Sequence, residues 1–376
     1  MHRHLDRFTV TPAGPPREPP MKSLPGPVDW ARRNLFNGMF NTILTLIVGY
    51  VLLMSVPYML WWSVLGAEFG AVGAEACVAH LAEVGGACWG AIWEKWGFIL
   101  FGTYPLDERW RPFIACVLIT AAMIASGMKR FWGLQLAPIW AVAIIGFFVL
   151  MGGGVLGLSE VRTSQWGGLP LTLMLSVFGA IFAFPLAILV ALGRRSSLPA
   201  IKTICVLYVE FVRGVPLITV LFMASFMFPL FLPEGVDINN LLRAQVGIIL
   251  FIAAYLAEVV RGGLQAIPKG QYEAASALGL GYWKQMALIV LPQALKISIP
   301  PIVNTLIGMF KDTSLILIIG LFDILALAKS SSQDTDWARF YIEYYVFVAL
   351  IFWAYCWGMS QYSQWLERDL HRGHNR

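Results

Sequence analysis

Charged side chains are scarce in this chain, and short nucleotide-binding and metal-binding motifs are missing from it. Only 13% of its 376 residues are Asp, Glu, Lys or Arg, whereas 58% are hydrophobic. No G-x-x-x-x-G-K-S/T sequence occurs, so the chain lacks the loop that commonly cradles nucleotide phosphates. The five histidines and five cysteines show no spacing typical of a metal site. We therefore expect no catalytic residue, metal or cofactor in this chain itself.

Long apolar segments make up most of the remaining sequence. A helix needs about 20 apolar residues to cross a bilayer, and eight segments approach or exceed this length. They cover residues 38–62, 112–127, 131–153, 168–191, 206–232, 244–261, 297–326 and 341–361. The second segment is short and the seventh is long. This pattern predicts an all-α integral membrane protein with about eight transmembrane helices.

The distribution of Lys and Arg predicts the orientation of these spans. Basic residues occur in the N-terminal tail and an even number of crossings later, at Arg3, Arg7, Arg17, Lys22, Arg32, Arg33, Lys129, Arg130, Arg194 and Arg195. The segment after the first span is mostly acidic. We expect tails 1–37 and 367–376 in the cytoplasm and the acidic loop outside. The polar, Pro-rich start predicts no cleavable signal peptide, and its charges predict contact with anionic lipid rather than nucleic acid.

A polar segment between two apolar ones carries a distinctive motif. Its marked positions are Glu273, Ala274, Ala275, Gly279, Leu291 and Pro292. Good helix formers from Gln271 to Leu278, followed by Gly279, predict a helix of about two turns. So short a helix needs a partner surface, which small alanine side chains would allow to come close. The spacing resembles the EAA loop of ABC importer permeases, at about residues 263–292, which in that family couples the permease to an ATPase subunit.

Further strings resemble permeases for polar and general L-amino acids. These strings are RGVPL at 213–217, EVVRGG at 258–263, LPQA at 291–294 and KDTSL at 311–315. The resemblance covers the chain from about Gly167 onward. It implies a five-helix type I ABC importer permease core at 161–366, preceded by a three-span extension at 38–160 with a large periplasmic loop. Longer members of this family have such an extension.

The resemblance also implies an assembly in the bacterial inner membrane. It predicts two ATPase subunits that bind ATP and Mg²⁺, a periplasmic amino-acid-binding protein and a second permease subunit. The resemblance favours a distinct homologue for that subunit, while symmetry also allows an identical copy. The chain would transport polar or general L-amino acids and hydrolyse nothing itself.

One charged pattern occurs twice in the predicted core. Glu210 and Arg213 precede Gly214, as Glu258 and Arg261 precede Gly262. Opposite charges at this i,i+3 spacing can neutralise each other on one helix face. They form either an inner gate or coupling surface, or ordinary interfacial charges that follow the positive-inside rule.

Ionisable residues also lie inside the predicted span 297–326. Lys311 and Asp312 stand near its middle, where an ionised side chain costs roughly 2.5 to 3.5 kcal/mol. Asp312 is our candidate to receive the ammonium group of an amino acid, while Thr313 and Ser314 satisfy freed carbonyls or face a cavity. Asn304, two turns earlier on the face of Asp312, is a weaker candidate. The alternative is a buried ion network that only packs the spans.

Two cysteines lie in the predicted outer loop. An oxidising periplasm permits a disulfide between Cys77 and Cys88, but the sequence leaves the bond open.

Two other classes of function fit the sequence less well. A secondary transporter driven by an ion gradient commonly has matched broken helices in both halves, and the sequence shows one broken charged span. A membrane scaffold or sensor would leave Lys311 and Asp312 without a role.

Overall fold

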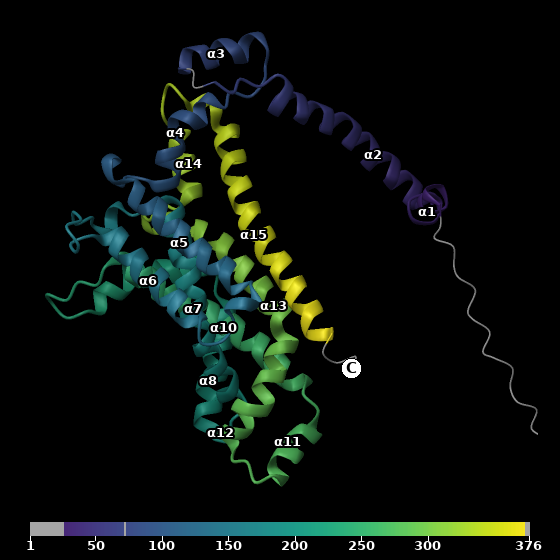
Figure 1. Cartoon of the computed structure of the whole chain (residues 1–376), viewed down its shortest axis with the longest axis vertical. Coiled ribbons are helices and arrows are strands. Elements are labelled where there is room, and N and C mark those ends of the chain that lie inside the picture. Colours follow the sequence, from purple (N-terminus) through teal and green to yellow (C-terminus); the bar gives the residue numbers. More distant parts are fainter. Residues whose placement is uncertain (1–25, 71–72, 373–376) are drawn as a thin grey trace, which may run out of the picture. The chain divides into compact units, whose positions relative to one another are not determined.

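The computed structural model describes residues 26–70 and 73–372 (Figure 1). Within these ranges the regular structure is helical, apart from isolated β-bridges between Glu68 and Cys88 and between Gly168 and Asp323. Six helical stretches of the described chain are long and apolar enough to cross a membrane, and one bent pair would make a seventh. The predicted all-α membrane class is confirmed. The chain forms two compact units, Met1–Ala67 and Glu68–Arg376, and each is described by itself.

The first unit contains the first predicted span. α1 (Pro27–Asn34) begins with a proline, whose fixed φ suits a first helical turn. α2 (Met39–Leu60) continues through a π-helical turn, η1 (Trp61–Leu65), to give 27 residues. None of α2 is buried and apolar side chains surround it, as expected for a helix in lipid. Four basic tail residues that predict the orientation lie outside the described residues: Arg3, Arg7, Arg17 and Lys22.

The second unit begins with four helices. α3 (Ala74–Glu83) and α4 (Gly90–Phe101) precede a hairpin of α5 (Trp110–Ser126) and α6 (Leu136–Gly152). With the preceding turn η2 (Leu106–Glu108), α5 gives a stretch of 21 residues. α6 has 17 residues and is shorter than the predicted segment 131–153. A 3₁₀ turn, η3 (Lys129–Phe131), and Gly133 at a φ of 96° occupy the start of that segment.

Three long helices pack closely at the centre of this unit. They are α7 (Gly168–Arg194), α10 (Asn240–Ala266) and α13 (Leu291–Asp312). A Cβ atom on Gly263 of α10 would lie 2.0 Å from Ser298 Oγ and 2.6 Å from the carbonyl oxygen of Ala294, both on α13. Small residues at helix contacts allow this approach. The α10–α13 packing therefore requires glycine at position 263.

The predicted span 206–232 is not a straight helix. α8 (Pro199–Gly214) is followed by α9 (Leu217–Phe222), the π-turn η5 (Met223–Met227) and η6 (Phe228–Phe231). The two halves meet at an angle of 105°. Pro216 lacks a backbone N–H and disfavours helical geometry at Val215, which is extended with ψ of 136°. A hinge therefore interrupts this apolar run.

The rest of the chain runs from a loop through α13 to a long final helix. α11 (Lys269–Ala277), α12 (Tyr282–Gln285) and the π-turn η7 (Met286–Val290) lead into α13. The 3₁₀ helix η8 (Thr313–Ile319) follows, then α14 (Ile324–Ser331), η9 (Ala338–Phe340) and α15 (Tyr341–Arg372). The seventh span therefore covers Tyr282–Ile319 rather than 297–326. Lys311 and Asp312 accordingly lie toward its second end, not near its middle.

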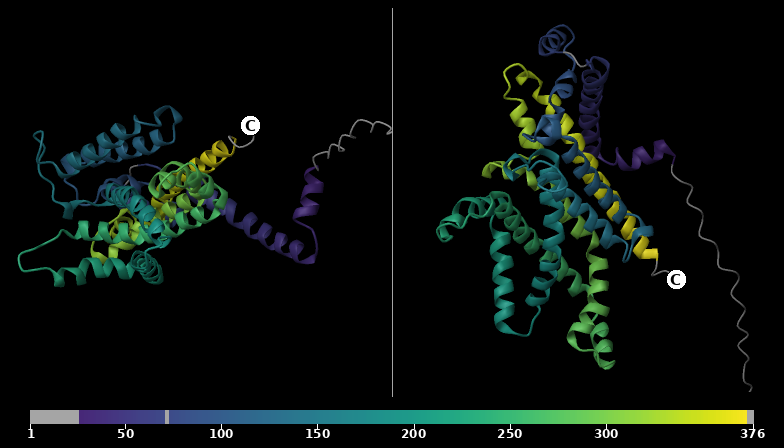
Figure 2. Two further views of the ribbon diagram at one scale, coloured as in Figure 1. Left: turned by 90° about the horizontal axis from the view of Figure 1, so that it is seen from below. Right: turned by 60° about the vertical axis from the view of Figure 1, so that its left-hand side comes forward.

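Different helices lie at the two ends of the second unit. α11 and α12 lie together at one end, near α8 (Figure 2), and we call this the loop end. α3, α4 and α14 lie at the opposite end, which we call the cap end.

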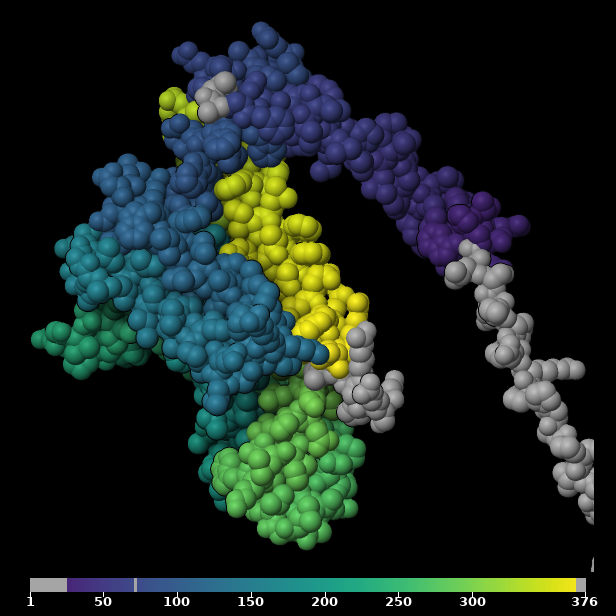
Figure 3. Space-filling view, in the orientation of Figure 1, coloured from purple at the N-terminus to yellow at the C-terminus, as the bar shows by residue number. Residues whose placement is uncertain are grey.

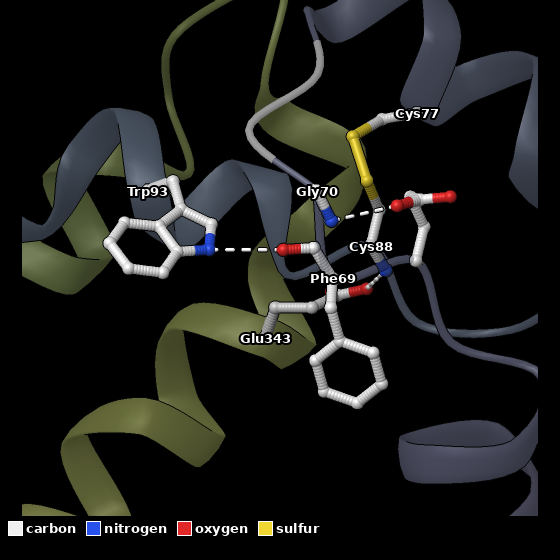
Figure 4. Close-up of a disulfide and its surroundings, with 7 residues drawn as sticks. Phe69, Gly70, Cys77, Cys88, Trp93 and Glu343 are labelled. Atoms are coloured by element: carbon white, nitrogen blue, oxygen red, sulfur yellow. Dashed lines mark hydrogen bonds between the residues drawn. A yellow bond between two sulfur atoms is a disulfide. The ribbon is translucent and has the colours of Figure 1, made fainter.

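A disulfide holds the cap end together (Figure 4). Cys77 of α3 is bonded to Cys88, with Cα atoms 5.6 Å apart. The Cys88 N–H donates to Glu343 Oε1 of α15 at 3.1 Å, and Lys95 Nζ donates to Asp334 Oδ2 at 2.6 Å. These bonds join the predicted extension to the predicted core within one compact unit. The functional boundary near residue 160 stays a prediction.

Candidate functional site

The loop end carries the short helix that the motif predicts. Pro268 stands just before α11, and Gly279 stops it in the left-handed conformation with φ of 72°. The Leu280 N–H donates to the Ala275 carbonyl at 3.2 Å, and the Gly279 N–H to that of Ser276 at 3.0 Å. This pair of bonds is a Schellman motif, which satisfies the last carbonyls of a helix. Glycine at position 279 thus fixes where α11 ends.

The motif residues divide between the two faces of α11. Ala275 is 1% exposed and packs inward, whereas Glu273 and Ala274 face outward. Glu273 forms no ion pair with another described residue, so its charge is open to a partner. Leu291 and Pro292 lie beyond the loop and form the first turn of α13.

Two large side chains that sequence reasoning missed also face outward here. Leu278 is 77% exposed and Trp283 is 70% exposed, while Tyr282 packs edge-on against Trp283 at a centroid distance of 5.3 Å. Figure 3 shows this segment projecting at the lower end of the molecule. These exposed apolar groups, on a projecting loop rather than along a membrane span, make the loop end a candidate interaction surface. The signal in the sequence was an aromatic pair directly after Gly281.

The two repeated Glu/Arg pairs behave differently. Glu258 and Arg261 form the expected i,i+3 pair, with Arg261 Nε donating to Glu258 Oε2 at 3.0 Å. Glu210 instead accepts from Arg194 Nη2 at 2.8 Å, because Arg213 turns toward α10. The Arg213 guanidinium lies 3.8 Å from Glu258 and 5.5 Å from the centre of the Tyr255 ring.

Glu258 therefore interacts with arginine side chains from three helices. It accepts hydrogen bonds from Arg194 of α7 and Arg261 of α10, and it lies near Arg213 of α8. From the sequence, Arg194 contributed only to the predicted orientation of the spans. Whether this network acts as gate, coupling surface or interfacial charge stays a prediction.

The polar stretch of the seventh span lies where α13 ends. Thr313 Oγ1 donates to the Phe310 carbonyl at 2.8 Å, and Ser314 Oγ to that of Lys311 at 2.9 Å. Both hydroxyls thus satisfy carbonyls at a change from α-helix to 3₁₀ helix. The helix runs through Pro300 and Pro301 and breaks only after Asp312.

The expected alignment of Asn304 with Asp312 is wrong. Seven residues are close to two helical turns, so Asn304 shares a face with Lys311. Both side chains are exposed, together with Ile297 and Pro301 on the same face, whereas Asp312 is half-buried. Asn304 and Lys311 are the polar members of this open face of α13, and we call the two the polar stripe; Asp312 lies at its edge.

A cavity of about 380 Å³ lies elsewhere, between α7, α13 and α15. Its lining is apolar apart from Lys296, and it includes Phe184 and Leu366 but not Asp312. The polar stripe and this cavity are therefore separate. Among the described residues, no group of three His, Cys, Asp or Glu side chains could hold a metal ion.

The chain is similar in sequence to a known family of membrane transport proteins. A family model described as "binding-protein-dependent transport system inner membrane component" matches residues 183–372. The chain is 48% identical to the inner membrane amino-acid ABC transporter permease protein YhdY of Escherichia coli, over 92% of this chain and 93% of that one. It is 38% identical to the glutamate/glutamine/aspartate/asparagine transport system permease protein BztC of Rhodobacter capsulatus, over 98% and 99%. A crystal structure of an amino acid ABC transporter with histidines aligns with a TM-score of 0.48 and 29% identity, over 54% of this chain and 92% of that chain.

Proposed function

The chain belongs to the family of binding-protein-dependent transport system inner membrane components, and we propose that it is the membrane-spanning subunit of an ATP-driven importer of polar amino acids. The observation that carries this proposal is α11, a helix of 9 residues that is capped, exposed and projecting. So short a helix presents a surface to a partner rather than forming a core of its own. Nothing in the comparisons favours the ion-gradient alternative.

Two relatives support the substrate class. One is named for amino acids in general, and the other for glutamate, glutamine, aspartate and asparagine. A free amino acid carries an ammonium and a carboxylate group. Asp312 is the side chain that we assign to the ammonium, and Lys311, on the open face of α13, can receive a carboxylate.

The family implies an ATPase and a binding protein as partners, and we propose two ATPase subunits and a second, distinct permease. Lys311 and Asn304 face outward from a transmembrane helix. A charged side chain that faces lipid is unfavourable, although the cost is smaller toward the end of a span than at its centre. A second permease that covers this face would remove the cost and enclose a pathway between the two subunits.

We assign the loop end to the cytoplasm and the cap end to the periplasm. Two separate observations support this orientation. Arg194, Arg195, Arg213 and Arg261 gather near α11, as the positive-inside rule expects. The Cys77–Cys88 disulfide lies at the opposite end, where an oxidising compartment is needed. Both termini would then lie in the cytoplasm of a bacterial inner-membrane protein.

Transport would work as a population shift. ATP and Mg²⁺ belong to the partner ATPases, and this chain contributes no nucleotide site. A displacement of α11 by the ATPases would favour one of two arrangements of the spans. Asp312 and Lys311 would hold the amino acid while the pathway changes the side to which it opens.

Uptake of labelled amino acids tests the proposal. Cells that lack the chain would be complemented with wild type, Glu273→Arg, or the control Glu75→Arg, whose exposed side chain lies at the cap end. The proton gradient would be collapsed while ATP is maintained. We expect wild type and the control to transport, and Glu273→Arg to reach the membrane without transporting. Uptake that follows the gradient and ignores Glu273 would sink the proposal.

A further inference from the structure

Two consecutive arginines at the end of α7 divide between two networks. Arg195 Nη1 donates to the Leu264 carbonyl of α10 at 2.8 Å and to the Tyr272 hydroxyl of α11 at 2.9 Å. Its guanidinium also lies 5.4 Å from the centre of the Tyr272 ring. Arg194 points instead into the acidic network, to Glu258 at 2.7 Å and Glu210 at 2.8 Å.

We propose that Arg194, Arg195 and Tyr272 are positioning residues that carry a displacement of α11 to the hinge between α8 and α9. This inference rests on the proposed function, because it concerns how ATP turnover at α11 reaches the spans. None of the three is expected to touch the substrate. Their role is to make the loop and the hinge move together.

Tyr272 is well placed to transmit movement of the whole loop. Its hydroxyl donates to the Leu264 carbonyl at 3.1 Å, and its own carbonyl accepts from Gln285 Nε2 of α12 at 2.7 Å. Gln285 is buried. α11 and α12 are therefore tied to each other through Tyr272, and Tyr272 is tied to Arg195. A partner that pushes on the exposed face of α11 must move or break these contacts.

The hinge side is connected just as directly. Glu210 lies one turn before Gly214, after which the chain bends by 105°. Arg194 holds Glu210 from α7, and Arg213 joins the same helix turn to Glu258 of α10. The side chains of Arg194 and Glu258 are 11% and 24% exposed, so water screens this pair less than a surface pair, whereas the side chain of Glu210 is 62% exposed.

The charges of this network allow a second pairing. Arg194, Arg213 and Arg261 contribute three positive charges against two negative charges from Glu210 and Glu258, leaving a net charge of +1. Glu210 pairs with Arg194 here, but its spacing from Arg213 also permits an i,i+3 pair on α8. Exchange of Glu210 between the two arginines is a discrete switch, which long-range coupling requires.

The test uses the full complex of permease, ATPases and binding protein in lipid vesicles. Both ATP hydrolysis and uptake are measured for wild type, Tyr272→Phe, Arg195→Lys and the control Tyr341→Phe. Tyr272→Phe keeps the ring under Arg195 and removes only the hydroxyl. Tyr341 is an exposed tyrosine at the start of α15, so its hydroxyl makes a matched control.

We expect normal assembly and continued ATP hydrolysis in Tyr272→Phe and Arg195→Lys, with uptake per ATP reduced about 5-fold or more. Tyr341→Phe should behave as wild type. Glu210→Gln is measured alone and together with Tyr272→Phe, and the double variant should reduce the ratio less than the two single effects combined, because both act on one connection.

Unchanged uptake per ATP in both variants would overturn the inference. So would a complex that no longer assembles, because the contacts would then serve folding rather than coupling. A wild-type complex that takes up nothing when it hydrolyses ATP would overturn the proposed function itself, which separates the two failures.

Discussion

Asp323, just before α14 at the cap end, is a buried carboxylate with an incomplete set of partners. It is 0% exposed. Oδ1 accepts from the Ala326 N–H at 2.8 Å and caps α14, whereas Oδ2 is buried and has no hydrogen-bond partner among the residues that the structure describes. Burial raises the pKa of Asp323 from 3.8 to about 6, because an ionised carboxylate is poorly solvated there. We predict that this residue makes stability depend on pH.

The raised pKa fixes the sign and size of the effect. The folded protein binds the proton more tightly than the unfolded chain, so the stabilisation is complete below about pH 4. It declines as the pH rises and is lost above about pH 6. A difference of about two pKa units corresponds to about 3 kcal/mol. Asp323→Asn keeps the Oδ1 acceptor but cannot ionise. Its unfolding free energy relative to that of wild type should therefore rise by about 3 kcal/mol between pH 4 and pH 8.

The assay is unfolding in detergent at several pH values between 4 and 8. Asp336→Asn is the control, because Asp336 lies at the same end and is exposed. The quantity of interest is the difference in unfolding free energy between variant and wild type, since effects of other titrating groups cancel in it. If the unfolding free energies of wild type and Asp323→Asn depend on pH in the same way across this range, the reasoning is refuted.

Three further predictions concern the cap, the loop and the polar stripe. Replacing Cys77 and Cys88 together by serine should lower the stability of the cap by about 3 kcal/mol, because the bond closes a loop with a sequence separation of 11. A gel mobility of the wild-type protein that does not change on reduction would contradict the bond. Trp283→Ala should weaken ATPase binding about 30-fold without unfolding the permease, as for an exposed aromatic anchor. Equal co-purification of ATPase with variant and wild type would count against it. Asp312→Asn should reduce uptake by about 30-fold with normal assembly, through loss of a charged hydrogen bond. Normal uptake would remove Asp312 from the pathway.

The helix α11 shows what local sequence can predict. Helix formers followed by Gly279 predicted the helix to within two residues at its start and one at its end. These signals act within a few residues, so they survive without knowledge of the rest of the fold. The faces of α11 were not predictable in the same way, because burial of Ala275 depends on what packs beneath it.

The paired charges show the limit of such reasoning. The i,i+3 spacing correctly paired Glu258 with Arg261, but Glu210 found Arg194 sixteen residues earlier in the chain. The two motifs are alike in sequence and differ in their neighbours, since α10 is central and α8 crosses the end of α7. Which partner a long charged side chain selects is decided by the helices that come within its reach.

Composition and local motifs determined the membrane class, the number of apolar segments, the short helix α11 and the family of this protein. Those properties follow from hydrophobicity and backbone preferences that act over one turn or one span. Tertiary structure alone decided the hinge angle after Gly214, the disulfide between Cys77 and Cys88, the open face shared by Asn304 and Lys311, and the division of Arg194 and Arg195 between two networks. Each of these depends on contacts between segments far apart in the sequence, and such contacts exist only once the helices have packed.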